Sequence, residues 1–283
     1  MGPSVKSLSG TVETLAENTQ GNVTSSMNQI LSQEDIERFH LNGYVRLESA
    51  FDRTLTHRVM TYIWEILEQR YGFDREDSST WNRPTKGLTK ILQANRDLWN
   101  IGDQKITYAI TQLLGPSWKS PTHWGTLLHT MPESSDMWNI PTGWHWDSDP
   151  LEIINGKEGL FIFIFMSHVL PQGGGTLILE GAHKLLLRYH RRGVEAKGGH
   201  NTFFKAHPWL VDLRNNTGPM NERVARLMEQ NAEIENIKVR VVELTGEPGD
   251  AVLCHPLIVH ARSQNASKVP RFMLAKRIWR EQA

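Results

Sequence analysis

Two short stretches contain residues of the types that bind a metal ion. The first is residues 142–150 (TGWHWDSDP), and the second, residues 249–271, contains His260 and ends at an arginine. On an extended strand, positions i and i+2 point to the same face, so His145 and Asp147 can bind one ion together. His260 can add a third ligand from a distant strand. Two histidines and one carboxylate on one side of a metal, with the other positions open, is the arrangement of non-heme Fe(II) oxygenases.

The H-x-D pattern is informative only together with its surroundings. With 12 histidines in 283 residues, chance gives about half an H-x-D per chain of this composition. Asp149 is a second carboxylate, but it lies beyond the i, i+2 pair and precedes Pro150 in a predicted turn. His255 is a second distal histidine, and because it lies five residues before His260, the two face opposite sides of a regular strand. Spacing within the strand therefore leaves His255 and His260 as alternatives.

The composition is that of an ordinary globular protein without a charge bias. Hydrophobic residues make up 39% of the chain and charged residues 22%, both close to the usual values. Lys+Arg and Asp+Glu balance at 31 each, so no global field attracts the chain to nucleic acid or to a membrane surface. We therefore expect neither of these partners. The sequence does not determine the oligomeric state.

Cys254 is the only cysteine, which excludes an internal disulfide and a cysteine-based zinc site. It lies in the apolar run 251–254, so we predict a buried small hydrophobic residue rather than a nucleophile. A lone cysteine favours a reduced intracellular compartment, and we predict a cytoplasmic protein. No apolar run approaches the roughly 20 residues that a membrane-spanning helix needs. The N-terminus lacks the pattern of a secretory signal.

The first part of the chain predicts a tail followed by helices. Residues 1–30 are rich in Ser, Thr, Asn and Gln, which predicts a flexible N-terminal tail. Ser32 and the acidic residues after it predict the start of a short helix. We expect a single domain over residues 31–283. Helical spacing of apolar residues predicts further helices at residues 55–70, 89–99 and 105–114.

The later part of the chain predicts mainly strands. Residues 160–168 (LFIFIFMSH) are apolar on both faces, as in a central strand covered on both sides. Other strands are predicted at residues 44–47, 124–131, 176–179, 237–244, 251–254, 258–261 and 272–278. Residues 185–235 predict an insertion between two core strands, with a helix at 221–231, that forms one wall of the substrate cavity.

The order of these elements predicts the fold class. Helices come first and strands follow, without regular βα alternation, which argues against Rossmann and TIM-barrel folds. We predict a mainly β fold with supporting helices around a double-stranded β-helix core, that is, a cupin-like jelly roll. Such double sheets hold ligands between their two layers.

Several stretches resemble, in the same order, the phytanoyl-CoA dioxygenase family of Fe(II)- and 2-oxoglutarate-dependent oxygenases. Residues 35–52 (DIERFHLNGYVRLESAFD) look like the family's opening helix and first strand. WHWD at 144–147 stands where the family has its H-x-D, and GGGTLILEGAHK at 173–184 looks like its glycine-rich turn. GEPGDAVLCHPLIVHARSQN at 246–265 resembles its Gly-Asp, His, His and Asn stretch. The resemblance covers roughly residues 31–283.

The resemblance implies which residues bind iron and cosubstrate. It implies His145, Asp147 and His260 as the Fe(II) ligands and leaves His255 a structural role. It also implies that Arg271 holds the far carboxylate of 2-oxoglutarate. A planar guanidinium suits this role because it matches a carboxylate bidentately and stays charged when partly buried.

Six other residues are candidates for the same cavity. The residues that could contact the cosubstrate are Thr176, Lys90 and His129. The residues that could line the substrate pocket are Trp144, Trp146 and Arg262.

We therefore predict an Fe(II)- and 2-oxoglutarate-dependent dioxygenase that uses O2. It would hydroxylate a small organic molecule, or otherwise oxidise it at C–H, while 2-oxoglutarate is decarboxylated to succinate. Asp147 favours these reactions, because halogenating relatives lack this carboxylate. One alternative is a cupin-like hydrolase or isomerase, which would use the same ligands with another metal and would not need Arg271. The other is a non-catalytic small-molecule-binding protein on the same fold.

Overall fold

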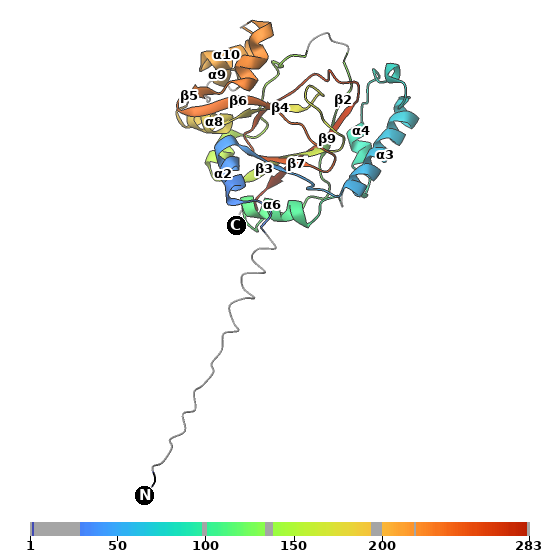
Figure 1. Cartoon of the computed structure of the whole chain (residues 1–283), viewed down its shortest axis with the longest axis horizontal. Helices are drawn as coiled ribbons and strands as arrows, with labels where there is room; N and C mark the ends of the chain where they lie inside the picture. The colour runs from blue at the N-terminus through green and yellow to red at the C-terminus, as the bar shows by residue number, and fades with distance from the viewer. Residues whose placement is uncertain are drawn as a thin grey trace.

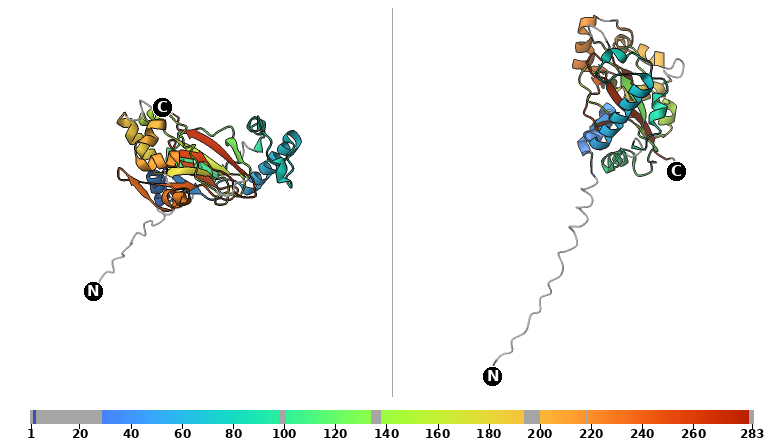
Figure 2. Two further views of the ribbon diagram at one scale, coloured as in Figure 1. Left: turned by 90° about the horizontal axis from the view of Figure 1, so that it is seen from above. Right: turned by 90° about the vertical axis from the view of Figure 1, so that its right-hand side faces the viewer.

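The computed structural model describes residues 29–97, 101–133, 138–193, 200–217 and 219–281, together with Gly2. Most of the tail predicted for residues 1–30 lies outside the described residues. The described chain forms two antiparallel sheets with helices against their outer faces (Figures 1 and 2). This arrangement confirms the predicted mainly β, jelly-roll fold.

The two sheets have five and four strands. Their orders are β1-β7-β3-β9-β2 and β5-β6-β4-β8. The strands are β1 (Tyr44–Leu47), β2 (Thr126–Thr130), β3 (Gly159–Phe165), β4 (Thr176–Glu180), β5 (Ala232–Ile234), β6 (Ile237–Glu243), β7 (Ala251–Cys254), β8 (Val259–Arg262) and β9 (Arg271–Trp279). Residues of both sheets form one apolar core between them, so the sheets face each other.

Strand β3 lies at the centre of the five-stranded sheet and is buried at every position. It pairs with β7 on one side and with β9 on the other. Its odd-numbered residues, from Phe161 to Phe165, belong to the core between the sheets. Its even-numbered residues, from Leu160 to Ile164, belong to the core under the helices. The continuous apolar run is thus a strand buried on both faces, as predicted.

Helices of the N-terminal part cover the outer face of the five-stranded sheet. They are α2 (Gln33–Asn42), α3 (Arg53–Tyr71), α4 (Leu88–Leu92) and α6 (Gln104–Leu114). The predicted N-cap is confirmed, because Ser32 accepts a hydrogen bond from the N–H of Asp35 and the carboxylate of Asp35 accepts one from the N–H of Ser32. Helix α4 ends earlier than the helix predicted at 89–99. A 3-10 turn, η1 (Ser78–Thr80), precedes it.

The predicted insertion covers the outer face of the four-stranded sheet. Its helices α8 (Ala182–Arg191), α9 (His200–Lys205) and α10 (Pro208–Asn215) gather on this side (Figure 1). The segment predicted as a helix at 221–231 is helical over 220–229, but it is not a regular α-helix: it consists of a 3-10 turn, η2 (Met220–Glu222), and a π-helical turn, η3 (Ala225–Glu229), joined by residues 223–224. Arg223, between the two turns, is fully buried and donates hydrogen bonds to the last carbonyls of α10. This buried side chain lies where the segment changes from 3-10 to π-helical geometry.

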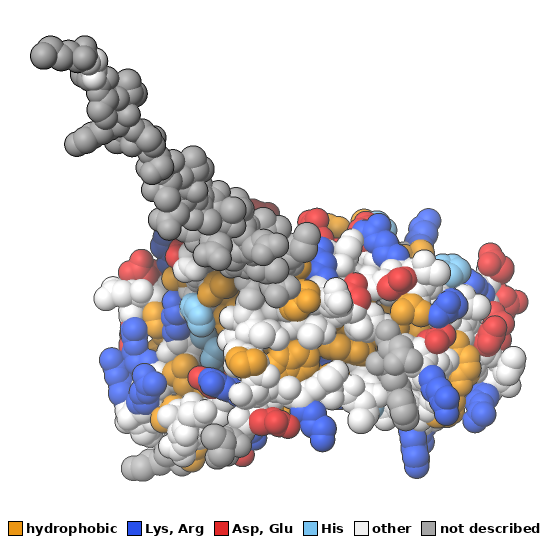
Figure 3. Space-filling view, turned by 90° about the horizontal axis from the view of Figure 1, so that it is seen from below, with side chains coloured by type: hydrophobic (Ala, Val, Ile, Leu, Met, Phe, Trp, Pro, Cys, Tyr) orange, Lys and Arg blue, Asp and Glu red, His pale blue; other side chains and the backbone are white. Residues whose placement is uncertain are grey.

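No helix in the described ranges is long and apolar enough to cross a membrane. The formal net charge of the whole chain is zero. Basic and acidic side chains both occur on the face shown in Figure 3, and neither kind covers it.

His183, which is buried, and His255, which is partly buried, pack together between α8 and the turn after β7. The rings of His183 and His255 are 4.8 Å apart, and Nδ1 of His255 accepts a hydrogen bond from the N–H of Leu257 at 3.1 Å. Burial lowers the pKa of His183 to about 4 and the pKa of His255 to about 3, and the charge of His183 further lowers that of His255. Both imidazoles are therefore neutral in the folded protein at neutral pH.

Acidification is expected to destabilise the fold through these two histidines. Since both folded-state pKa values lie below the unfolded value of about 6.5, the unfolded state binds protons first as pH falls below that value, and stability decreases toward pH 4. His255→Asn keeps an acceptor for Leu257 but cannot be protonated. Its urea midpoint should therefore fall less than that of the wild type between about pH 7 and pH 5. His57→Asn, at an exposed position, should keep the wild-type dependence; an unchanged dependence in His255→Asn would contradict this origin.

Candidate active site

A cavity of about 680 Å³ lies between the two sheets. Its lining residues come from β2, β3 and β9 of one sheet, from β4 and β8 of the other, and from the segment that contains His145 and Asp147. A cavity of this size can hold a small-molecule ligand. No described residue of the insertion at 185–235 lines it. In the described chain the insertion is thus not the predicted cavity wall, and it supports the four-stranded sheet from outside.

Backbone pairing brings His145 and His260 together. The N–H of His145 donates to the carbonyl of His260 at 3.0 Å, and the N–H of His260 donates to the carbonyl of His145 at 2.8 Å. Residues directly opposite each other in an antiparallel pair project to the same face, and the two rings are 4.3 Å apart. Strand β8 therefore positions both histidines.

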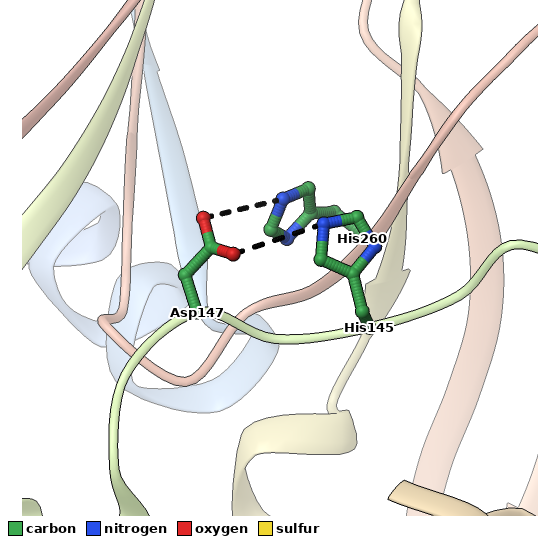
Figure 4. Close-up of side chains that lie close together, drawn as sticks. All are labelled: His145, Asp147 and His260. Atoms are coloured by element: carbon green, nitrogen blue, oxygen red, sulfur yellow. Dashed lines mark ion pairs between the residues drawn. The ribbon is translucent and has the colours of Figure 1, made fainter.

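Asp147 completes the group from the same segment as His145. Its Oδ1 lies 3.8 Å from Nε2 of His145, and its Oδ2 lies 3.8 Å from Nε2 of His260 (Figure 4). One ligand atom from each residue lies within 4.8 Å of those of the other two. The three predicted metal ligands are therefore brought together around one point.

The orientation of both imidazoles is fixed by main-chain carbonyls. Nδ1 of His145 lies 3.0 Å from the carbonyl oxygen of Gly143, and Nδ1 of His260 lies 3.1 Å from that of Ile258. An Nδ1–H that donates to a carbonyl leaves Nε2 as the free lone pair. Burial, followed by the neighbouring His145, lowers the pKa of His260. Both rings thus present Nε2 toward Asp147, and His260 is neutral, the form that binds metals.

The two rival ligands serve other purposes. Asp149 caps helix α7 (Pro150–Ile154) by accepting a hydrogen bond from the N–H of Leu151 at 2.9 Å. His255 packs against His183 and does not line the cavity. The sequence suggested a strand at 142–149, but the segment is not a regular one. Its only pairing among the described residues is the bridge at His145.

The two tryptophans beside His145 point away from the cavity. Trp144 and Trp146 belong to the apolar core under α8, α9 and α10. Local alternation requires this, because His145 and Asp147 project to the other side. They therefore do not line the cavity, in contrast to the sequence-based expectation. They anchor the segment from behind, where the guanidinium of Arg214 donates to the carbonyl of Trp144.

Arg271 reaches the cavity from the five-stranded sheet and is 2% exposed. Its Nε donates to the carbonyl of Gly174 at 2.6 Å, and its Nη1 donates to the carbonyl of Leu128 at 3.1 Å. No carboxylate of the described chain forms an ion pair with it. Burial, and then the charge of Arg262, lowers the pKa of Arg271, but a guanidinium stays protonated at neutral pH. A buried cation without a counter-ion is costly, so this position favours an anionic ligand.

The other predicted contacts have mixed outcomes. Thr176 and Arg262 are cross-strand partners and both line the cavity, as does His129. Lys90 is exposed on α4 and does not line it, because α4 turns its buried leucines toward the sheet. The polar contact from this region is Thr85, whose Oγ1 lies 2.8 Å from Nε2 of His129.

Sequence reasoning missed the aromatic floor of the cavity. Phe161 and Phe163 of β3 line it, and their rings lie 5.2 and 5.8 Å from the ring of His260. Alternate residues of a strand face opposite sides of the sheet. This period of two along the apolar run at 160–168 could have shown that Phe161 and Phe163 share one face.

It also missed Arg277 on β9. This residue lines the cavity and is the cross-strand partner of Phe161 on the neighbouring strand β3. Its Nη1 donates to the carbonyl of Asp147 at 3.3 Å. Counting in steps of two from Arg271 along an extended strand leads to Arg277 and places both on the same face.

Comparison with protein families agrees with the metal and cosubstrate site that this geometry indicates. The sequence model described as phytanoyl-CoA dioxygenase (PhyH) matches residues 39–273. The chain belongs to the phytanoyl-CoA dioxygenase family. As a member of this family it is an Fe(II)- and 2-oxoglutarate-dependent oxygenase, which confirms the enzyme class and the cofactors expected from the sequence. A search of curated proteins found no match.

The solved structures similar to this family member include one that shares its fold at a TM-score of 0.50. EvdO2 from Micromonospora carbonacea var. aurantiaca, complexed with 2-oxoglutarate, is 14% identical, with a TM-score of 0.50 over 89% of this chain and 92% of that one. The non-heme alpha ketoglutarate dependent carbocyclase SnoK from nogalamycin biosynthesis is 17% identical, with a TM-score of 0.48 over 89% and 85%. EctD from S. alaskensis with bound Fe is 14% identical, with a TM-score of 0.49 over 88% and 76%.

Proposed function

We propose that His145, Asp147 and His260 bind Fe(II), that Arg271 binds the far carboxylate of 2-oxoglutarate, and that the enzyme oxidises a C–H bond of a small organic molecule. The observation that carries this proposal is that a cluster of three ligand atoms and a buried, uncompensated guanidinium line the same cavity. When bound, iron and 2-oxoglutarate supply the oxidation of a C–H bond by O2, and 2-oxoglutarate becomes succinate and CO2.

The donor set fits iron. Two imidazole nitrogens and one carboxylate on one side of the ion leave the other positions for cosubstrate and O2. The carbonyls of Gly143 and Ile258 hold the rings in the required orientation. Such outer hydrogen bonds fix the tautomer and raise the basicity of the ligand nitrogen.

The cation fits the cosubstrate. Arg271 is held by the carbonyls of Gly174 and Leu128, which leaves its Nη2 without a described partner. A carboxylate would supply the missing counter-ion through charge-assisted hydrogen bonds. Thr176 and His129 line the same part of the chain's cavity and are the further proposed contacts of 2-oxoglutarate.

The reaction proposed is hydroxylation, or a desaturation or ring closure that also begins at a C–H bond. Asp147 supports this choice, since halogenating relatives lack the carboxylate. The apolar residues around the ligands, among them Phe161 and Phe163, limit the access of water to the reacting carbon. A hydrolase or isomerase with the same three ligands would have no use for a buried Arg271.

The oxygenase and hydrolase alternatives differ in their metal and oxygen requirements. With ascorbate and no added substrate, the purified protein is expected to form succinate slowly from 2-oxoglutarate, with Fe(II) and O2 both required. Zn(II) should not replace Fe(II), because it is not redox-active. Succinate formation without O2, or at the same rate with Zn(II), would contradict the proposal.

We also propose that residues 31–283 form a single domain and that the protein acts in the cytoplasm on a small molecule. The family match over 39–273 supports the domain limits. The compartment is supported by the single cysteine. Cys254 is buried, and burial raises the pKa of its thiol, so its role is that of an apolar side chain.

A further inference from the structure

The described lining of the cavity is rich in cations and contains one carboxylate, Asp147. The cationic side chains are Arg262, Arg271, Lys276 and Arg277. Arg262 pairs with Glu133 at 3.3 Å, and the proposed function assigns Arg271 to the cosubstrate. Lys276 and Arg277 form no ion pair with a carboxylate anywhere in the described ranges. Arg277 is exposed at the edge of the cavity, so after the cosubstrate is bound its charge is available to a further anionic ligand.

Arg277 lies beside the proposed iron ligands. Its Nη1 donates to the carbonyl of Asp147 at 3.3 Å, and its cross-strand partner is Phe161, whose ring is 5.2 Å from that of His260. Arg271 is six residues earlier on the same strand, a separation of about 20 Å along an extended backbone. The two arginines therefore serve different ends of the cavity.

His123 and Lys276 are the other residues with nitrogen side chains on this side of the lining. Lys276 is the cross-strand partner of Ile162, which belongs to the core under the helices, so its side chain leaves β9 on the face opposite to that of Arg277. The charge of Lys276 helps to lower the pKa of His123, after burial, so the two side chains lie within electrostatic range. Nδ1 of His123 accepts a hydrogen bond from the N–H of Gly125 at 3.3 Å. The remaining proton of the neutral ring is therefore on Nε2, which can donate to a ligand.

We propose that the substrate carries an anionic group, a carboxylate or a phosphate, that is bound by Arg277. The guanidinium fork matches either group bidentately. The apolar body of the substrate would lie over Phe161 and Phe163, next to the iron ligands. This inference rests on the proposed function, because it places the oxidised C–H bond between the anion site and the metal.

The test uses three ligands with the same six-carbon chain: hexanoate, hexyl phosphate and 1-hexanol. Each is titrated calorimetrically into the protein loaded with Fe(II) and saturating 2-oxoglutarate without O2. At least one of the two anions is expected to bind about tenfold or more tightly than hexanol, and Arg277→Gln should remove this preference. The stronger of the two anions identifies carboxylate or phosphate as the recognised group. Arg280→Gln, at an exposed arginine that does not line the cavity, should keep the preference.

The controls separate this inference from the proposed function. Fe(II) and 2-oxoglutarate binding is measured before any six-carbon ligand is added, and its absence in the wild type would contradict the proposed function itself. With that binding intact, equal affinities for hexanol and both anions would overturn the anion site. So would an unchanged preference in Arg277→Gln. Loss of 2-oxoglutarate binding in Arg277→Gln would reassign Arg277 to the cosubstrate and overturn the inference as well.

Discussion

Asp147→Ala is expected to lose Fe(II)-dependent succinate formation by about 10³-fold or more, because it removes the only anionic ligand of the proposed iron. Asp147 is the one carboxylate among the described residues that line the cavity, so no neighbour can replace it. The affinity for Fe(II) should fall together with the rate. Both are measured on the purified protein, by metal titration and by succinate formation.

Asp149→Asn is the matched control, two residues away on the same segment. Its carboxylate caps α7 and does not line the cavity, and asparagine is an equally good N-cap. This variant should keep the wild-type Fe(II) affinity and rate. Loss of Fe(II) binding in Asp149→Asn, or its retention in Asp147→Ala, would show that the metal site is assigned to the wrong carboxylate.

Arg271→Met is expected to weaken 2-oxoglutarate binding by about 10²- to 10³-fold, the cost of removing one partner of a buried charge pair. The discriminating ligand is 2-oxopentanoate, which has the same five-carbon chain with a methyl group in place of the far carboxylate. The wild type should prefer 2-oxoglutarate strongly over 2-oxopentanoate. The variant should bind both weakly and with similar affinity, as measured by titration of the Fe(II)-loaded protein.

The preference separates a direct contact from a general loss of structure. If Arg271 only stabilises the fold through Gly174 and Leu128, both 2-oxo acids would weaken together and the preference for 2-oxoglutarate would survive. A melting temperature recorded for each variant provides the control for folding. Survival of the preference in a folded variant would exclude Arg271 as the carboxylate site.

The strands and the iron ligands could be predicted because local patterns determine them. The run at 160–168 has the composition of a doubly covered strand, and the structure buries all of β3. His145 and Asp147 share a face by their spacing. His260 could be chosen over His255 only through the family resemblance, and the structure explains the choice by the bridge that pairs His260 with His145.

Other parts of the site depend on contacts between distant segments. Trp144 and Trp146 are an exception: they were expected in the substrate pocket, although local alternation around His145 could have placed them in the opposite core. Lys90 was placed by its position in the sequence, but the side of α4 that faces the sheet is set by Leu88 and Leu92. Alternation from Arg271 could have placed Arg277 on the cavity face, but its position beside Asp147 depends on the pairing of β9 with β3.

The measurement that tests the central claim most directly is an anaerobic titration of the protein with Fe(II) and 2-oxoglutarate, followed in the visible spectrum. A 2-oxo acid bound to Fe(II) through two oxygens gives a weak charge-transfer band, and the measurement needs no knowledge of the substrate. The wild type is expected to develop this band, Asp147→Ala to lose it, and Arg271→Met to require far more 2-oxoglutarate. Absence of the band in a wild-type protein that has demonstrably bound Fe(II) at saturating 2-oxoglutarate would contradict the proposed cosubstrate site.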